Sequence, residues 1–393
     1  MSRIENKRRK LRPVMKLASD IIWEILRRLP AADLVRFKSV SKAWYSIITH
    51  PQFLRDHLNY VSTAENEFRI LVTHQNRFHS IFYHEEDNAQ KKVPVLPPQM
   101  VIPEFTFVHG SCDGLLLFLA QRRRSLEENR IVICNPCTKK LIKMPITRPV
   151  LHFPDCYGPR EDLFGLGYDP HTDDYKVLRF PSALKARENM TFDKKNGFNC
   201  LVEAYSLKTK SWKIIQDGGF MYLIKRLAPA TVNRRPHWIA THITNPDSSQ
   251  CVIFYFDAGK DNFGDMMLPP SVQENVSVHN YRGFLGLAEF SIQGEFILWS
   301  MKEYGKPDSW VKLLTIPNVP APKRCIWHRA PAPVFITETG KVLFRTAEGQ
   351  LGVYDGKDGK FIEPLIQGHS GGFLRGTPYV ESLVSPSGGN LKW

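Results

Sequence analysis

The chain has 393 residues, of which 42% are hydrophobic and 11% aromatic, and its formal net charge is +14. This composition is typical of a globular protein, and the length suits a small module beside a larger core. No segment approaches the roughly 18 uninterrupted apolar residues of a membrane span, and the seven scattered cysteines favour free thiols over a disulfide framework. We therefore expect a protein of the nucleus, the cytoplasm or both, with no membrane partner.

The first sixteen residues form a basic tail. Seven lysines and arginines stand against a single acidic residue, Glu5, within residues 1–16. So many charges with so few apolar residues predict a disordered arm. The KRRKLR run at 7–12 leaves two interpretations open, a nuclear-import signal and a solvated arm, and nucleic-acid binding ranks below both.

Residues 17–58 have the hydrophobic spacing of three short amphipathic helices. The first helix carries an apolar stripe that ends at Pro30, and the apolar face continues through a second short turn. Ser41 is placed to cap a third helix, which His50-Pro51 should end. A unit of this size can barely bury its own core, so its exposed apolar faces suggest docking to a partner.

This segment resembles an F-box. The matching residues are Leu17, Ile21, Ile22, Ile25, Leu26, Leu29, Pro30, Leu34, Arg36, Phe37, Val40, Lys42 and Trp44. The resemblance implies binding to a Skp-type adaptor and, through it, to the cullin and RING subunits of a ubiquitin ligase. The expected adaptor contacts are Leu17, Ile21, Ile25, Leu29, Pro30 and Leu34. The proline usual after the first leucine is Ala18 here, so we expect a less rigid helix entry and a weaker contact.

From residue 68 to 384 the helical period gives way to short strand-like runs that end in clusters of turn residues. Strand-turn-strand units start at Arg130, Leu201, Cys251, Glu295 and Leu351, at spacings of 71, 50, 44 and 56 residues. Apart from the first, these spacings suit four-stranded propeller blades of ~40 to 50 residues. They predict an all-β, propeller-like domain of about six blades, followed by a C-terminal tail at 385–393. A pair of β-sandwiches is the less favoured architecture.

The same region resembles the F-box-associated domain of plant F-box proteins, a kelch-propeller-like module that binds substrates. The resemblance is carried by GSCDGLLLF at 110–118, NPCT at 135–138, FGLGYDPHTDDYKVLRF at 164–180, VEAYSLKTKSW at 202–212, LWSMKEYGKPDSWVKL at 298–313 and YVESLV at 379–384. Family members usually have Trp at the position of Cys134, so the smaller thiol predicts looser packing there. The resemblance implies a non-catalytic receptor for a target protein that the sequence does not identify.

Three motifs have the spacing of chemical sites but also have a structural interpretation. The C-x-x-C of Cys134 and Cys137 has no second pair to complete a zinc site, and a strand end followed by a turn explains it. GSCDG at 110–114 has the form of a nucleophile elbow, but a strand follows it where an elbow requires a helix. Asp173 and Asp174 lie in a turn, where Asp side chains bind backbone amides. We expect no catalytic residue, metal or cofactor.

Aromatic residues at hairpin ends are candidates for a sugar-stacking or peptide-binding surface, although packing between blades is the favoured role. They are Trp212, Tyr255, Trp299, Trp310 and Tyr354. The leading hypothesis is the substrate-recognition subunit of an SCF-type (Skp-cullin-F-box) ubiquitin ligase. The alternatives are a propeller-based carbohydrate-binding protein or enzyme, and a basic nuclear protein that binds nucleic acid.

Overall fold

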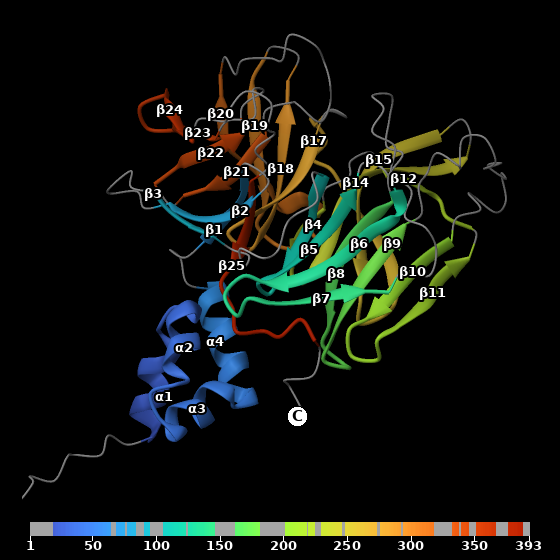
Figure 1. Ribbon diagram of the computed structural model, residues 1–393. Helices are drawn as coiled ribbons and strands as arrows, with labels where there is room; N and C mark the ends of the chain where they lie inside the picture. The colour runs from blue at the N-terminus through green and yellow to red at the C-terminus, as the bar shows by residue number, and fades with distance from the viewer. Residues whose placement is uncertain are drawn as a thin grey trace, which may run out of the picture.

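Four α-helices lie at one side of a ring of antiparallel sheets in the computed structural model (Figure 1). The residues that it describes are 19–63, 68–74, 77–83, 90–94, 105–122, 125–145, 162–180, 201–217, 219–224, 229–245, 248–272, 276–291, 294–317, 332–337, 339–345, 351–366 and 376–387. Within these ranges no helix has both the length and the apolar character needed to cross a bilayer. The predicted basic tail lies outside the described residues.

The helices are α1 (Ser19–Arg27), α2 (Ala31–Phe37), α3 (Lys42–Thr49) and α4 (Pro51–Thr63). Three of them were expected, and Ser41 caps α3 as predicted, since its hydroxyl accepts a hydrogen bond of 3.1 Å from the backbone N–H of Trp44. The fourth helix corrects the prediction. His50 has an extended backbone and ends α3, but Pro51 has the preset φ that favours the first position of a helix and so begins α4.

The helices share a small core of their own. Its buried members are Leu26, Ala31, Leu34, Ile48, Phe53, Leu54 and, from the far end of the chain, Leu383. Trp23 closes one side of this core with an edge contact to Phe53, at 5.1 Å between ring centroids. Each helix therefore contributes one apolar face to the core, and Leu383 is part of the core although it follows the last strand.

The described strands form six antiparallel sheets. The first sheet contains, in spatial order, β25 (Gly376–Val380), β1 (Phe68–His74), β2 (Arg77–Tyr83) and β3 (Gln90–Pro94). The second contains β4 (Phe105–Cys112), β5 (Leu115–Arg122), β6 (Ser125–Asn135) and β7 (Lys140–Met144). The third contains β11 (Ser211–Asp217), β10 (Leu201–Ser206), β9 (Asp174–Phe180) and β8 (Leu163–Asp169). The first sheet thus pairs the last described strand of the chain, β25, with the first, β1.

The other three sheets follow in chain order. The fourth sheet contains β12 (Tyr222–Ile224), β14 (Arg235–Asn245), β15 (Ser248–Asp257) and β16 (Asn262–Met267), and β13 (Ala230–Val232) also pairs with β14. The fifth contains β17 (Val276–Tyr281), β18 (Phe284–Phe290), β19 (Phe296–Met301) and β20 (Trp310–Ile316). The sixth contains β21 (Ala332–Ile336), β22 (Lys341–Arg345), β23 (Leu351–Asp355) and β24 (Lys360–Ile366). A short 3-10 helix, Pro307–Ser309, precedes β20. About six blades were expected; five of the sheets are regular four-stranded blades, and the sheet with β12 and β13 has five strands.

Neighbouring sheets meet through their inner strands. β4 lies against β8 and β25, β17 lies against β13 and β21, and further contacts of β8 with β14 and of β21 with β25 complete the circuit. A closed ring is a propeller and excludes the pair of sandwiches. Because β25 pairs with β1, the two ends of the domain are joined by backbone hydrogen bonds within one sheet.

One hairpin turn recurs through the propeller and explains the repeated turn sequences. Asn135, Asp169, Asp257 and Asp355 each place a side-chain oxygen against backbone N–H groups two or three residues ahead, and Ser206 bonds the N–H three residues ahead. Such side chains mimic a backbone turn. In the DPHTDD turn this role belongs to Asp169 and not to the predicted pair: Asp173 accepts from the hydroxyl of Tyr168, and Asp174 accepts from groups on the neighbouring hairpin.

Packing between the third and fourth sheets depends on a close approach at Gly165. A Cβ there would lie 2.7 Å from the ring of Trp238, whose side chain is fully buried, so that any larger residue would displace the indole. Cys134 is buried in the cluster between the first two sheets, with Leu116 and Tyr379.

Candidate functional site

The outer face of α1 carries two of the predicted adaptor contacts. Ile21 and Ile25 lie one helical turn apart, and each has 49% of its surface exposed. With Asp20, Glu24 and Arg28 they line a shallow depression on the helix. The opposite side of α1 packs into the helical core. An apolar surface rimmed by charges, on a helix whose own core is already filled, is characteristic of a contact with another protein.

The other four predicted contacts are placed differently. Leu29 and Pro30 are partly buried where α1 ends. Leu34 has no exposed surface, because the face of α2 that carries it turns into the helical core. A direct contact of Leu34 with a partner is therefore not available in this conformation, and its role there is to hold α2 against its neighbours. Leu17 lies outside the described residues.

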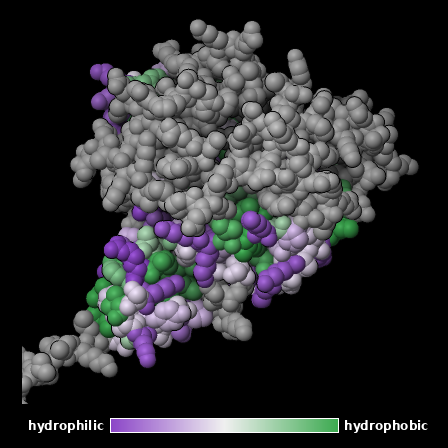
Figure 2. All heavy atoms as spheres, in the orientation of Figure 1, coloured by the Kyte–Doolittle hydropathy of each residue, from purple (hydrophilic) through white to green (hydrophobic). Residues whose placement is uncertain are grey.

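Two exposed apolar residues were not among the expected contacts. Val40, which follows the end of α2, is 59% exposed, and Tyr45 on α3 is 55% exposed. Figure 2 shows hydrophobic side chains on the surface of the helical unit, between hydrophilic ones. The sequence placed Val40 on the apolar face that continues through the second turn. Because α2 ends at Phe37, helical spacing does not set the direction of this side chain.

The joint between the helices and the propeller is built partly from α4. Phe53 and Leu54, in its first half, belong to the helical core. Leu58 and Val61, in its second half, belong to the cluster that fills the space between the second and third sheets. The predicted domain boundary at residue 58 therefore falls inside a helix that is shared by both units.

The second part of the joint is the segment 381–385, which we call the C-terminal strap. It leaves β25 and runs between the helices and the β6–β7 turn (Figure 1). The Nδ2 of Asn135 donates to the carbonyl oxygens of Ser382 at 2.9 Å and Val384 at 2.7 Å, while its Oδ1 caps the turn by accepting from the N–H of Cys137. Asn135 is fully buried.

The strap is also held by the turn that follows β4. The hydroxyl of Ser382 donates to the carbonyl oxygen of Asp113 at 2.6 Å. Gly114 has a positive φ of 81°, and a Cβ there would lie 2.7 Å from the carbonyl oxygen of Val380. A side chain at position 114 would therefore clash with the chain that leads into the strap. The GSCDG, NPCT and YVESLV motifs, far apart in the sequence, therefore meet at one place.

The side chain of Asp113 extends this network toward the next sheets. Its carboxylate pairs with Arg234 at 2.9 Å and accepts a hydrogen bond of 2.8 Å from the hydroxyl of Tyr175. Burial raises the pKa of the Asp113 carboxyl, although Arg234 and Tyr175 both stabilise its charged form. Arg234 in turn stacks over the ring of Tyr168, 4.8 Å from its centroid. The arrangement crosslinks three sheets around the ring.

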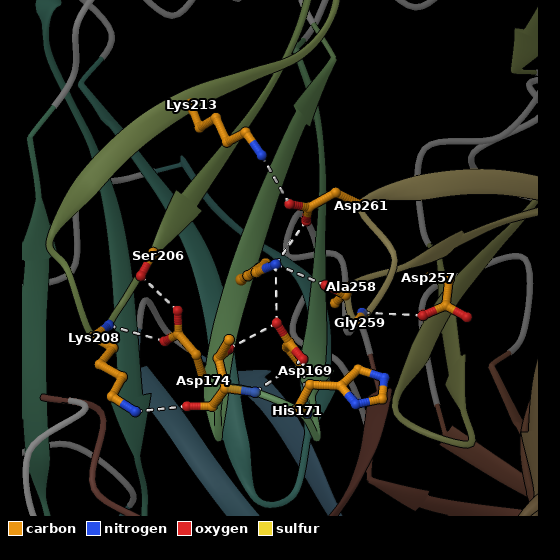
Figure 3. Close-up of polar contacts among 12 residues, drawn as sticks. Asp169, His171, Asp174, Ser206, Lys208, Lys213, Asp257, Ala258, Gly259 and Asp261 are labelled. Atoms are coloured by element: carbon orange, nitrogen blue, oxygen red, sulfur yellow. Dashed lines mark hydrogen bonds and ion pairs between the residues drawn. The ribbon is translucent and has the colours of Figure 1, made fainter.

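A second polar cluster joins the third and fourth sheets at their hairpin turns (Figure 3). The Nζ of Lys176 lies 3.1 Å from a carboxylate oxygen of Asp169 and 2.7 Å from one of Asp261, which belongs to the neighbouring sheet. Asp174 accepts hydrogen bonds from the hydroxyl of Ser206 and the backbone N–H of Lys208. Each of these carboxylates is thus paired with a lysine or with N–H and O–H donors of the protein. The cluster therefore crosslinks the third and fourth sheets.

The cysteines of the two candidate chemical motifs are buried or packed. Burial raises the pKa of the Cys112 thiol well above its ordinary value, and it raises that of Cys134 to about 12. Strand β5 follows the GSCDG turn directly, so the motif is a hairpin and lacks the helix of an elbow. Cys137 packs against the helical core. Among the described residues no three potential metal ligands lie close enough together to bind an ion.

The aromatic residues at hairpin ends pack between blades, as the favoured interpretation predicts. Trp212 and Trp310, on outer strands, donate their indole N–H groups to the carbonyl oxygens of Pro145 and Met267 in the neighbouring sheets. Tyr354 is buried, and Tyr255 and Trp299 pack against the core cluster of the fourth and fifth sheets.

The sequence left the substrate-binding residues of the propeller open. The β6–β7 turn lies at the end of the second sheet that contacts the helices. Residues 123–124 and 146–161 lie outside the described residues, and none of the described residues is assigned to target binding.

Two family models match the chain. The model of the F-box associated beta propeller domain matches residues 52–386, and that of the F-box domain matches residues 15–56. Among curated proteins of Arabidopsis thaliana, F-box protein At4g22390 is 28% identical over 315 residues, which cover 76% of this chain and 74% of that protein. F-box/kelch-repeat protein At3g23880 is 25% identical over 383 residues, 94% of this chain and 96% of that protein. F-box protein CPR1 is 27% identical over 357 residues, 86% of this chain and 81% of that protein.

Proposed function

Because the chain belongs to the family of F-box proteins with an F-box-associated β-propeller domain, we propose that it is the substrate-recognition subunit of an SCF-type ubiquitin ligase. The pairing of the two domains supports a role in substrate recognition. The observation that carries the finer proposal is the exposed apolar face of α1, with Ile21 and Ile25, on the unit that matches the F-box. A Skp-type adaptor docks on that face, and the propeller holds a target protein.

The receptor acts by proximity and performs no chemistry. The adaptor links it to cullin and RING subunits, and the RING subunit brings the ubiquitin-loaded enzyme near the bound target. Holding two reactants on one assembly raises the effective concentration of the target's lysines, to the millimolar range for short connections. The kelch-like propeller contributes only the binding surface.

Reconstitution tests this proposal. The full chain, co-expressed with a Skp-type adaptor, should purify as a stable complex, and addition of cullin, RING and ubiquitin-loading enzymes should ubiquitylate the target that co-purifies from plant cells. A chain that modified a substrate with none of these components present would instead be an enzyme.

Two nested deletions should separate adaptor binding from the folding of the propeller. Removing residues 17–50 should abolish adaptor binding and leave a propeller that still captures its target, whereas removing 17–58 should also lower its melting temperature. The reason is Leu58, which packs on the propeller and is lost only in the longer deletion. Both deletions uncover Leu383, so the difference between them reports on residues 51–58 of α4, of which Leu58 belongs to the propeller cluster. Equal melting temperatures in calorimetry would place the boundary at residue 58, as first predicted.

We propose that the protein acts in the nucleus, the cytoplasm or both, with the KRRKLR run at 7–12 as an import signal. Deletion of residues 1–12 should reduce nuclear accumulation of a fluorescently tagged chain and leave adaptor binding unchanged, because so charged a segment joins no core. Substituting serine for the basic residues of the run, at constant length, is the matched control. Identical images of full-length and truncated chains would favour a solvated arm.

A further inference from the structure

We infer that the C-terminal strap locks the helical unit to the propeller, and that Asn135 is a positioning residue that orients the bound target relative to the ligase. The effect of the lock on the orientation of the target rests on the proposed function, whereas the lock itself is a property of the fold of this chain. Adaptor and target binding give no role to the strap or to the NPCT motif, and the lock gives a role to both.

The strap joins both hydrophobic cores with adjacent residues. Leu383 is buried in the helical core, and the next residue, Val384, is buried in the cluster between the second and third sheets. In an extended segment, successive side chains point to opposite sides. Two neighbouring residues therefore hold the two units together, and neither unit can rotate without removing one of these side chains from its core.

Polar contacts fix the strap along its length. Asn135 holds the backbone of Ser382 and Val384, the Ser382 hydroxyl bonds to the turn after β4, and Glu381 forms an ion pair with Arg69 on β1. Asn135 and Ser382 have no exposed surface, so water does not compete for these hydrogen bonds. A lost partner in such a place leaves a buried polar group unpaired, which destabilises the folded joint.

The helix α4 makes a second connection of the same kind. It carries Phe53 in the helical core and Leu58 between the sheets. The helix and the strap thus insert side chains into the same two clusters, and two chain connections restrict rotation between the units more than one connection does. We therefore expect the helical unit and the propeller to move as one body, so that the target lysines within reach of the ubiquitin-loaded enzyme are set by the joint.

Asn135 offers a substitution that separates the strap from the turn. Its Oδ1 caps the β6–β7 turn, and its Nδ2 holds the strap. Asn135→Asp keeps a capping oxygen but replaces the Nδ2 donor by an acceptor that faces the carbonyls of Ser382 and Val384. The matched control is Asp355→Asn, because Asp355 caps the equivalent β23–β24 turn and bonds to no strap.

The experiment measures the joint in the full chain, with spectroscopic labels introduced as non-natural amino acids at the exposed positions Ser46 and Lys312. The wild type and Asp355→Asn should give one narrow distance distribution, and Asn135→Asp a broad one. Leu383→Ser, which removes the helical anchor of the strap, is a second variant that should also broaden the distribution. Narrow distributions in both folded strap variants would overturn the lock.

The functional readout uses the reconstituted ligase and the target protein that co-purifies with the chain from plant cells. Both strap variants should retain adaptor and target affinity, while the rate of ubiquitin transfer falls by about ten-fold and the set of modified lysines changes, since misplacement of reacting groups by small distances slows transfer strongly. A variant with a broad distance distribution and an unchanged transfer rate and lysine set would overturn the positioning role. If the wild type bound no adaptor, the proposed function would fail, and the distance measurement would still decide whether the strap is a lock.

Discussion

The double substitution Ile21→Asp, Ile25→Asp should lower the affinity for a Skp-type adaptor by about a thousand-fold, because truncating a central apolar anchor costs about 2 kcal/mol and two are lost. Both side chains are about half exposed, so a charge at either position stays solvated in the free protein and the fold is preserved. Titration calorimetry or surface plasmon resonance with purified adaptor gives the affinity. The unfolding temperature shows that the variant is folded.

Exposure decides which apolar residues are suitable for this substitution and which residue serves as the control. Leu29, although an expected contact, is partly buried in the helical core, so an aspartate there would test folding as much as docking. Ile214→Asp on β11 of the propeller is the matched control, because Ile214 is 51% exposed and lies on a different unit. Its affinity should equal that of the wild type. Wild-type affinity in a folded Ile21, Ile25 double variant would remove the α1 face from the interface.

Acid should destabilise the propeller through His237. This imidazole is fully buried, with its ring nitrogens against the carbonyl oxygen of Ala230 and the hydroxyl of Tyr304, and burial lowers its pKa from the ordinary 6.5 to about 4. Between these two values the unfolded chain binds a proton that the folded chain does not. The contribution to stability is thus complete above pH 6.5 and declines by about 3 kcal/mol as the pH falls to 4.

Urea unfolding at a series of pH values tests this expectation in wild type and in His237→Gln, which keeps a polar group at the site and cannot be protonated. The free energy of unfolding should fall with decreasing pH below 6.5 in both proteins, because carboxylates also titrate near pH 4. The fall should be shallower in the variant. Burial also lowers the pKa of His57, so this residue adds acid sensitivity in the same direction at the helical joint. Parallel pH profiles would show that His237 is not the responsible group.

The helices were predictable from the sequence because the interactions that define them are local. Ser41 caps α3 through a hydrogen bond within three residues, and the apolar spacing of α1 is read from a single turn of helix. The fourth helix was missed because a proline after His50 ends one helix and can begin another, and only the contacts of Leu58 and Val61 with the sheets show that the second helix forms.

The repeated hairpins were also predictable, because the residues that form each turn are neighbours in sequence. Asn135, Asp169 and Asp355 cap their turns with backbone groups two or three residues away. The number and regularity of the sheets depend on pairings over longer distances. The chain segments that pair in the first sheet, β25 and β1, lie at opposite ends of the domain, and no local signal connects them.

By itself the sequence determined the two-part organisation of this protein, because caps, apolar periods and turn residues act over a few positions and leave a pattern that can be read directly. Which apolar residues are left for a partner was decided by the tertiary structure. Leu34 and Ile25 are alike in chemistry, yet one is buried and the other half exposed. Burial is a collective property: it depends on which faces meet after the whole chain has folded. For the same reason only the folded chain brings Ser382 to Asn135 and joins the two units there.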